Sequence, residues 1–325
     1  MKILIIRFSS IGDLTQALSL PSFIKSYHPE AEVHFVTRSD LASVVENHPD
    51  VKRLWTLDRK LGLKGLIHLI GELRSQNFTH IYDAHNNLRS FFIRLFVSAQ
   101  FKHVRPMMRF KRFMLLNFHK NLFEMPFSGQ RDLIKPLEKW GMKFKLPPPP
   151  QLFLSPAQAT TPNLPEKFVA LVPSAAYELK RWPLEYWCEL VEKNPAVHFV
   201  VLAGPNDLFT QKLSHYNNVI NLTGQTDLLQ SAAVLQKSQL VVANDTGLLH
   251  FAEQLGKPAI ALMGPAAFGF PSRSATLILE RNLKCRPCSK HGQGPCVNAQ
   301  FHECLRSISV DEVSTHMNRM LKASL

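Results

Sequence analysis

Short apolar runs alternate with longer segments in which apolar residues recur every three or four positions. The runs are typical of strands buried on both faces, and the periodic segments are typical of amphipathic helices. In the first half we expect strands over Lys2–Phe8, Ala31–Thr37, Val51–Leu57 and Phe78–Tyr82, and helices over Leu14–Ser26, Asp40–Asn47 and Leu63–Arg74. Strands separated by helices predict a parallel sheet with helices on both faces.

The second half repeats this rhythm. We expect strands over Val169–Val172, His198–Ala203, Val219–Leu222, Leu240–Ala243 and Ala259–Met263, and helices over Leu184–Glu192, Asp227–Lys237, Gly247–Leu255 and Ser309–Ala323. Pro147–Pro150 is a stiff, extended run and the natural boundary. The sequence therefore predicts an α/β protein of two doubly wound domains, 1–150 and 151–325, with a ligand in the cleft between them. The final helix, Ser309–Ala323, could pack back across the junction between the two domains.

The segment Leu240–Pro265 is the most informative stretch. A buried strand leads into Asn244, Asp245 and Thr246, and a helix follows directly. The start of a helix carries unpaired N–H groups and a partial positive charge, so it suits a phosphate. The alternative is an ordinary strand–helix–strand unit in which Asp245 and Thr246 only cap the helix.

Composition describes a folded globular chain of 325 residues, with 45% hydrophobic and 19% charged residues. The first 150 residues carry 23 Lys and Arg against 12 Asp and Glu, whereas the remainder is nearly balanced at 15 against 13. The chain has neither an early secretory segment nor any apolar run of about 18 residues, which predicts a protein without a membrane span. Four of the five cysteines lie in one late loop, so we expect a reducing cytoplasm.

No acidic residue lies between Asp83 and Glu124. This interval interleaves basic residues with phenylalanines: Arg89, Arg94, Lys102, Arg105, Arg109, Lys111, Arg112 and Lys120 with Phe91, Phe92, Phe96, Phe101, Phe110, Phe113 and Phe118. Such a mixture fits an anionic membrane surface or a nucleic acid. The alternative is a solvated basic face above an aromatic core.

Neither a dinucleotide-binding G-x-G-x-x-G, a P-loop nor a G-x-S-x-G nucleophile elbow occurs. Phosphate binding without a P-loop then rests on the helix start at 245–250 and on a cation at Lys180 or Arg181, which could stabilise a departing diphosphate. Asp13 follows a strand in a loop, where its carboxylate could act as a general base. It could equally cap the following helix.

Three motifs together resemble the lipopolysaccharide heptosyltransferases: Ser9-Ser10-Ile11-Gly12-Asp13, Lys180-Arg181-Trp182-Pro183, and Asn244-Asp245-Thr246-Gly247-Leu248-Leu249-His250. Their order and spacing match along nearly the whole chain. The resemblance implies the GT-B architecture of two Rossmann-like domains, inversion at the anomeric carbon and no metal. It also implies ADP-L-glycero-D-manno-heptose as the donor, no other cofactor, and the lipopolysaccharide inner core as the acceptor.

The resemblance assigns roles to individual residues. Asp13 corresponds to the general base, and Lys180 to the cation on the donor diphosphate. The expected donor contacts are Ser174, Lys180, Asn206, Asp245, Thr246, Gly247, Leu248 and His250. Asn206 stands near a position where some relatives have a carboxylate on the ribose. The Lys-Arg-Trp-Pro form and the Cys-rich loop are more similar to the second-heptose enzymes.

The same resemblance makes residues 1–150 the acceptor domain and 151–325 the donor domain. Arg59, Lys60, Lys64 and Arg89 are then candidates for acceptor anions. We expect a monomer without nucleic acid, peripheral on the cytoplasmic face of the inner membrane. Two alternatives remain: a nucleic-acid-binding protein using the basic 84–123 face, and a sugar-nucleotide epimerase of the same fold.

The late loop contains Cys285, Cys288, Cys296 and Cys304. Its C-x2-C spacing leaves structural zinc, reduced thiols or one disulfide open, and nothing suggests a catalytic metal. Cys188 lies within an apolar helical pattern and is expected in the core.

Overall fold

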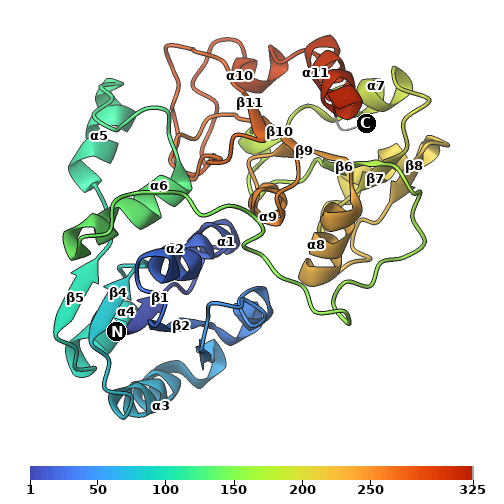
Figure 1. The fold of residues 1–325 in the computed structure, drawn as a ribbon. Coiled ribbons are helices and arrows are strands. Elements are labelled where there is room, and N and C mark those ends of the chain that lie inside the picture. Colours follow the sequence, from blue (N-terminus) through green and yellow to red (C-terminus); the bar gives the residue numbers. More distant parts are fainter. Residues whose placement is uncertain (324–325) are drawn as a thin grey trace. The chain divides into compact units, whose positions relative to one another are not determined.

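The computed structural model describes residues 1–323 of the chain, which divide into two compact units. One comprises Met1–Met108 with Gly129–Phe153, and the other Arg109–Ser128 with Leu154–Leu325. Each contains a parallel sheet with helices on both faces, as the sequence predicts (Figure 1).

The sheet of the first unit has the strand order β3-β2-β1-β4-β5, and every neighbouring pair is parallel. Its strands are β1 (Lys2–Ile6), β2 (Glu32–Arg38), β3 (Arg53–Leu57), β4 (His80–Asp83) and β5 (Phe101–Val104). Its helices are α1 (Ile11–Ala17), α2 (Ser19–Tyr27), α3 (Gly62–Arg74), α4 (Leu88–Phe96) and α6 (Gly129–Ile134), with 3-10 turns over Ser39–Val44, Arg59–Leu61 and Lys135–Trp140. The helices α1 and α2 pack with α6, whereas α3 packs with α4.

The sequence predicts one helix over Leu14–Ser26 that Pro21 should bend, whereas the structure has two helices that meet at Leu18. Pro21 is the third residue of α2. A proline has no N–H to donate, so it fits the first turn of a new helix better than the middle of a continuous one. The expected helix over Asp40–Asn47 is likewise a 3-10 turn over Ser39–Val44.

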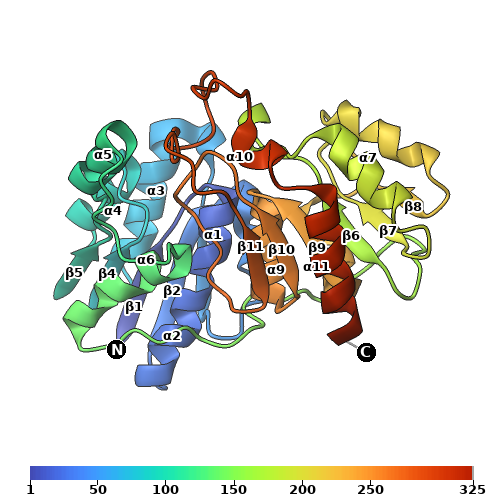
Figure 2. The same ribbon diagram turned by 90° about the horizontal axis from the view of Figure 1, so that it is seen from above.

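The sheet of the second unit has the order β11-β10-β9-β6-β7-β8 and is also parallel throughout. Its strands are β6 (Val169–Val172), β7 (Phe199–Val201), β8 (Val219–Asn221), β9 (Leu240–Asn244), β10 (Ala259–Leu262) and β11 (Thr276–Leu279). Its helices are α5 (Arg109–Phe118), α7 (Leu184–Glu192), α8 (Leu228–Lys237), α9 (Gly247–Leu255), α10 (Glu303–Arg306) and α11 (Val310–Ala323), with 3-10 turns over Glu178–Lys180 and Leu208–His215. Helices α8 and α9 pack together, and α11 packs on α7 and β9 (Figure 2).

Two apolar clusters form under these helices. In the second unit the cluster gathers around Trp182 and Trp187, which pack edge to face. In the first unit it lies between the sheet and the helices α3 and α4, with Leu69 and Ile93 among its buried members. These rigid layers fix the carboxyl ends of the strands, where the candidate site residues lie.

Candidate functional site

The carboxyl ends of β1 and β4 meet at one edge of the first sheet, since Ile6 pairs in register with Asp83. The loop after β1 leads to Asp13, the third residue of α1. One oxygen of the Asp13 carboxylate accepts hydrogen bonds from Ser10 Oγ at 2.8 Å and from Ser10 N at 3.3 Å. Ser10 is therefore the N-cap of this helix, and Asp13 supports it from the first turn.

Arg7 is the main charged partner of Asp13, and a guanidinium nitrogen lies 2.7 Å from the Asp13 carboxylate. Arg7 is buried and also donates to the backbone oxygen of Ala84 at 2.6 Å, which joins the β1 and β4 loops. Burial alone would raise the pKa of Asp13, but Arg7 and Arg105 lower this pKa to about 2. Asp13 is thus a permanently ionised hydrogen-bond acceptor at neutral pH, and 35% of its side chain is exposed.

His85 is a further titratable group in this edge and packs edge to face on Phe8. Burial and the nearby Arg7 lower the pKa of His85 to about 4, so the ring is neutral at pH 7. Beneath it, the fully buried Asp83 accepts hydrogen bonds from His85 N at 3.0 Å and from Arg94 Nε at 2.9 Å. The Asp83 carboxylate thereby holds the loop after β4 in place.

In the second unit, Asn244 at the end of β9 joins three segments. Its amide nitrogen donates to Pro173 O at 2.7 Å, and its amide oxygen accepts from Trp182 N at 3.0 Å. Asn244 is fully buried, so both bonds are shielded from water. They place the segment that contains Lys180 beside the start of α9.

Lys180 and Asp245 therefore meet, with Lys180 Nζ 2.6 Å from the Asp245 carboxylate. Both side chains are largely buried. Thr246 occupies the N-cap position of α9 but makes no capping hydrogen bond through its side chain. Thr246 therefore stands at the N-cap without capping the helix through its side chain, and the half-buried Thr246, Gly247 and Leu248 leave the first turn partly accessible.

Ser174 belongs to a neighbouring cluster at the ends of β6 and β7. Its hydroxyl donates to Asp207 at 2.5 Å, and the same carboxylate receives Gly204 N at 3.0 Å and the Arg181 guanidinium at 3.2 Å. Asn206 precedes Asp207 in this turn and is exposed. The carboxylate at this edge thus comes from Asp207, one residue beyond the expected contact.

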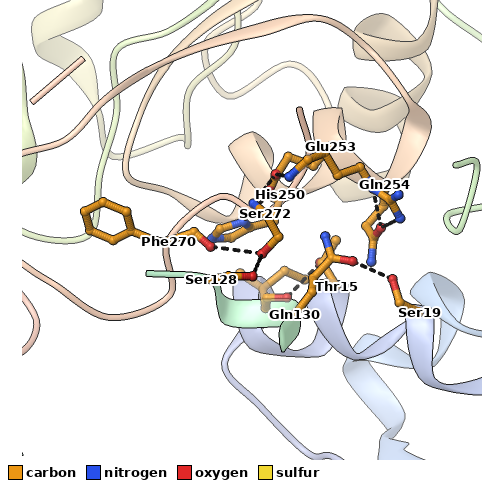
Figure 3. Close-up of polar contacts among 11 residues, drawn as sticks. Thr15, Ser19, Ser128, Gln130, His250, Glu253, Gln254, Phe270 and Ser272 are labelled. Atoms are coloured by element: carbon orange, nitrogen blue, oxygen red, sulfur yellow. Dashed lines mark hydrogen bonds and ion pairs between the residues drawn. The ribbon is translucent and has the colours of Figure 1, made fainter. Parts of the chain in front are cut away.

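His250, the fourth residue of α9, is buried within a polar network (Figure 3). Its Nδ1 lies 3.1 Å from Glu253, whose other carboxylate oxygen accepts from Ser272 N at 2.6 Å and from Arg273 N at 2.9 Å. Ser272 Oγ receives a hydrogen bond from Ser128 Oγ at 2.9 Å (Figure 3). Glu253 thus ties His250 to the β10–β11 connection.

The cysteine loop covers the stem of Lys180. Gly292 has a φ of +80°, and a Cβ atom built on it would lie 2.7 Å from Lys180 Cγ. His302 contacts Leu179 O through Nε2 at 2.9 Å, which fixes the loop to the same segment. The loop is therefore part of the wall that positions the lysine.

Four cysteines of this loop line one small cavity as free thiols: Cys285, Cys288, Cys296 and Cys304. Burial raises the pKa of Cys304 to about 12. Within residues 1–323, no three His, Cys, Asp or Glu side chains are arranged to hold a metal ion. Cys188 is a free thiol packed against the core of the second unit.

The basic interval folds into α4, β5 and α5, so the sequence between 84 and 123 is shared by both units. The four candidate cations Arg59, Lys60, Lys64 and Arg89 are all exposed, near the starts of α3 and α4. None of the helices in the described part of the chain is long and apolar enough to cross a membrane.

The two parallel sheets with helices on both faces have the fold of the GT-B glycosyltransferases. Residues 66–295 match the model of glycosyltransferase family 9 (heptosyltransferase). The chain belongs to this family.

The curated relatives cover most or nearly all of the chain. Lipooligosaccharide heptosyltransferase 2 of Haemophilus influenzae is 27% identical and aligned over 99% of both chains. Lipopolysaccharide heptosyltransferase 2 of Salmonella typhimurium is 26% identical over 83% of this chain and 84% of its own length. Among solved structures, a family 9 glycosyltransferase from Veillonella parvula matches with a TM-score of 0.78 at 18% identity, covering 99% of this chain and 97% of its own. The E. coli ADP-heptose lps heptosyltransferase II matches with a TM-score of 0.72 at 20% identity, covering 99% of each chain.

Proposed function

We propose that this glycosyltransferase moves heptose from ADP-L-glycero-D-manno-heptose to the lipopolysaccharide inner core, with inversion at the anomeric carbon. The observation that carries this proposal is the Lys180–Asp245 pair at the start of α9, where Thr246 makes no side-chain cap. A lysine beside a helix N-terminus suits a diphosphate. The names of these two relatives support heptose as the sugar and a lipooligosaccharide or lipopolysaccharide as the acceptor.

On the donor side, Lys180 and the amides of the first turn of α9 would bind the diphosphate of the donor. Asp245 holds the lysine ammonium 2.6 Å away in the free enzyme, so the cation needs little reorganisation when the phosphates arrive. Thr246, Gly247 and Leu248 belong to the same contact region. Positive charge from the chain itself would then balance the departing ADP, which agrees with a family that needs no metal.

Further donor contacts lie around this region. Ser174 and Asn206 flank the turn that holds Asp207, so they would contact the nucleoside portion of ADP. His250 acts indirectly in this proposal, because its bond to Glu253 stabilises the start of α9 and the segment at Ser272.

On the acceptor side, Asp13 would accept the proton of the attacking hydroxyl. Its low pKa makes it a weak base toward a free alcohol, so proton transfer would come late, when the anomeric carbon already carries positive charge and the hydroxyl has become acidic. Arg7 fixes the carboxylate for this step. Inversion follows because the hydroxyl attacks opposite the leaving diphosphate.

The acceptor itself is anionic, and the first half of the chain is strongly basic. Arg59, Lys60, Lys64 and Arg89 would contact phosphate or carboxylate groups of the lipid A core. The acceptor is a lipid, so we place a monomeric enzyme at the cytoplasmic face of the inner membrane. Because the chain belongs to a glycosyltransferase family, we favour sugar transfer over the nucleic-acid-binding and epimerase alternatives.

Calorimetric titration with ADP and ADP-heptose, followed by a transfer assay with lipid A core, tests the proposal. We expect both ligands to bind and heptose to appear on the acceptor. Binding of neither ligand to the wild-type chain would refute the assignment of the donor site. Binding of the donor without transfer of heptose would refute the assignment of lipid A core as the acceptor.

A further inference from the structure

The outer surfaces of α3 and α4 carry unusually many exposed apolar side chains. Six of them are between 45% and 70% exposed: Leu61, Leu63, Ile67, Leu88, Phe91 and Leu95. Single exposed apolar residues are normal on a soluble protein, but a gathered set marks an interaction site. We call these six residues the α3–α4 face.

The residues of the α3–α4 face differ from the residues that pack these helices on the sheet. Leu66, Leu69 and Ile93 point inward and belong to the core cluster of the first unit. On the outside, Leu63 and Ile67 are one turn apart on α3, and Leu88, Phe91 and Leu95 follow one stripe of α4. A helix that needs only to cover a sheet is polar on its outer side. The outward leucines are therefore available for a partner.

Positive charge accompanies the apolar residues. Arg59, Lys60, Lys64 and Arg89 lie among them and are exposed. Helix α4 contains no acidic residue, and the single acidic residue of α3 is Glu72, near its C-terminus. The combination of outward leucines and phenylalanine with lysine and arginine suits an interface between water and an anionic bilayer.

The position of the face agrees with this partner. Helices α3 and α4 begin after the carboxyl ends of β3 and β4, and in a parallel sheet these ends lie at the same edge as the end of β1. Asp13 follows β1 at that edge. A lipid-linked acceptor could therefore meet Asp13 from the membrane on which the helices rest.

We propose that the α3–α4 face docks the enzyme on an anionic lipid bilayer, with Leu61, Leu63 and Leu88 entering the headgroup region at the ends nearest Asp13. This inference rests on the proposed function, because the lipid acceptor supplies the reason for docking. It adds a defined membrane-contact surface formed by two helices of the first unit. A nucleic acid would interact with the cations of this face but would leave its leucines without an apolar partner. A second copy of the chain would present the same basic face, and the like charges would repel each other.

Co-sedimentation of the full chain with vesicles tests the proposal. The probes are vesicles of phosphatidylglycerol and phosphatidylcholine, compared with phosphatidylcholine alone. We expect binding to the anionic vesicles that falls with added salt. Leu63→Ser with Leu88→Ser should weaken this binding by about tenfold, since two largely exposed leucines would lose their burial in lipid. Leu208→Ser is the matched control, because Leu208 is 67% exposed on the second unit and should leave binding unchanged.

Several results would overturn the proposal. These are equal binding by the double variant and the wild type, loss of binding only when Phe110 and Phe113 of α5 are changed, and self-association that the double variant abolishes. A transfer assay separates this test from the proposed function. The double variant should retain wild-type turnover on a delipidated core acceptor and lose turnover on acceptor embedded in vesicles. Absence of transfer by the wild type on either acceptor would instead refute the proposed function.

Discussion

Replacing Lys180 with methionine tests the donor site most sharply, because the lysine has two separable roles. It neutralises Asp245 at 2.6 Å, and in our proposal it binds the donor diphosphate. The methionine retains much of the apolar stem that packs under Gly292. The variant therefore removes the charge with little change in volume.

The two roles have different magnitudes and different readouts. The Asp245 side chain is 8% exposed, so loss of its partner leaves a buried charge and should lower the free energy of unfolding by about 3 to 5 kcal/mol. Loss of a charge-assisted bond to phosphate should weaken ADP binding by about 1.5 to 3 kcal/mol, or about 10- to 150-fold. Thermal unfolding reports the first effect and calorimetry with ADP the second.

The double variant Lys180→Met with Asp245→Asn separates these effects. The neutral asparagine removes the uncompensated charge, so stability should return toward that of the wild type while ADP binding stays weak. Lys193→Met is the control, since Lys193 forms exposed ion pairs with Glu189 and Asp311. Wild-type ADP affinity in the double variant would show that the lysine serves the fold alone and would refute its role at the diphosphate.

Four further predictions concern the Arg7–Asp13 pair and the loop that covers Lys180. Asp13→Asn should lower kcat by about 10²- to 10⁴-fold and leave ADP binding unchanged, as single-turnover kinetics and calorimetry would show; a variant that retains wild-type kcat would exclude Asp13 as the base. Arg7→Met removes a cation that holds the pKa of Asp13 at about 2, and burial then raises this pKa. The pH–rate profile of the variant should therefore gain an acidic limb near or above pH 4 that the wild type lacks. Coincident profiles of the variant and the wild type would contradict the effect of Arg7 on the pKa of Asp13. The pair also stabilises the fold above about pH 4 and loses this effect as the pH falls toward 2, because the folded-state pKa is the lower one. Gly292→Ala should weaken ADP binding, because the new Cβ would push Lys180 aside. Gly294→Ala is the control, since Gly294 has a similar positive φ and a Cβ built on it would have no neighbour within 4 Å. Equal losses of ADP affinity in the two variants would point to backbone strain alone.

The sequence predicted the elements that have strong local signals. Val169–Val172, Leu184–Glu192 and Gly247–Leu255 match the structure at both ends, because each combines a clear apolar pattern with a defined stop. The edge strand β5 escaped prediction, since its residues are exposed or half-buried and show no apolar run. The helices α4 and α5 were not predicted either, because some of their phenylalanines are exposed and others are not, so the apolar residues do not follow a clear helical period.

The site was predictable as far as the motifs reach. Asp13, Lys180 and Asp245 stand in recognisable motifs, and the structure brings the last two together. Arg7 lies outside the three motifs, and Asn244 belongs to the third motif but its two bonding partners were not predicted, because both residues act through partners far away in the chain. Arg7 reaches Ala84 across 77 positions, and Asn244 reaches Trp182 across 62. Such contacts depend on which strands become neighbours, and local propensity does not encode that.

The most direct test of the account is the product formed from ADP-heptose and lipid A core by the purified chain. The account predicts that the wild type adds one heptose with inverted anomeric configuration and releases ADP, and that Asp13→Asn binds the donor but forms product about 10²- to 10⁴-fold more slowly. Heptose transferred with retained configuration, or transfer by Asp13→Asn at the wild-type rate, would contradict the proposed in-line mechanism with Asp13 as the base.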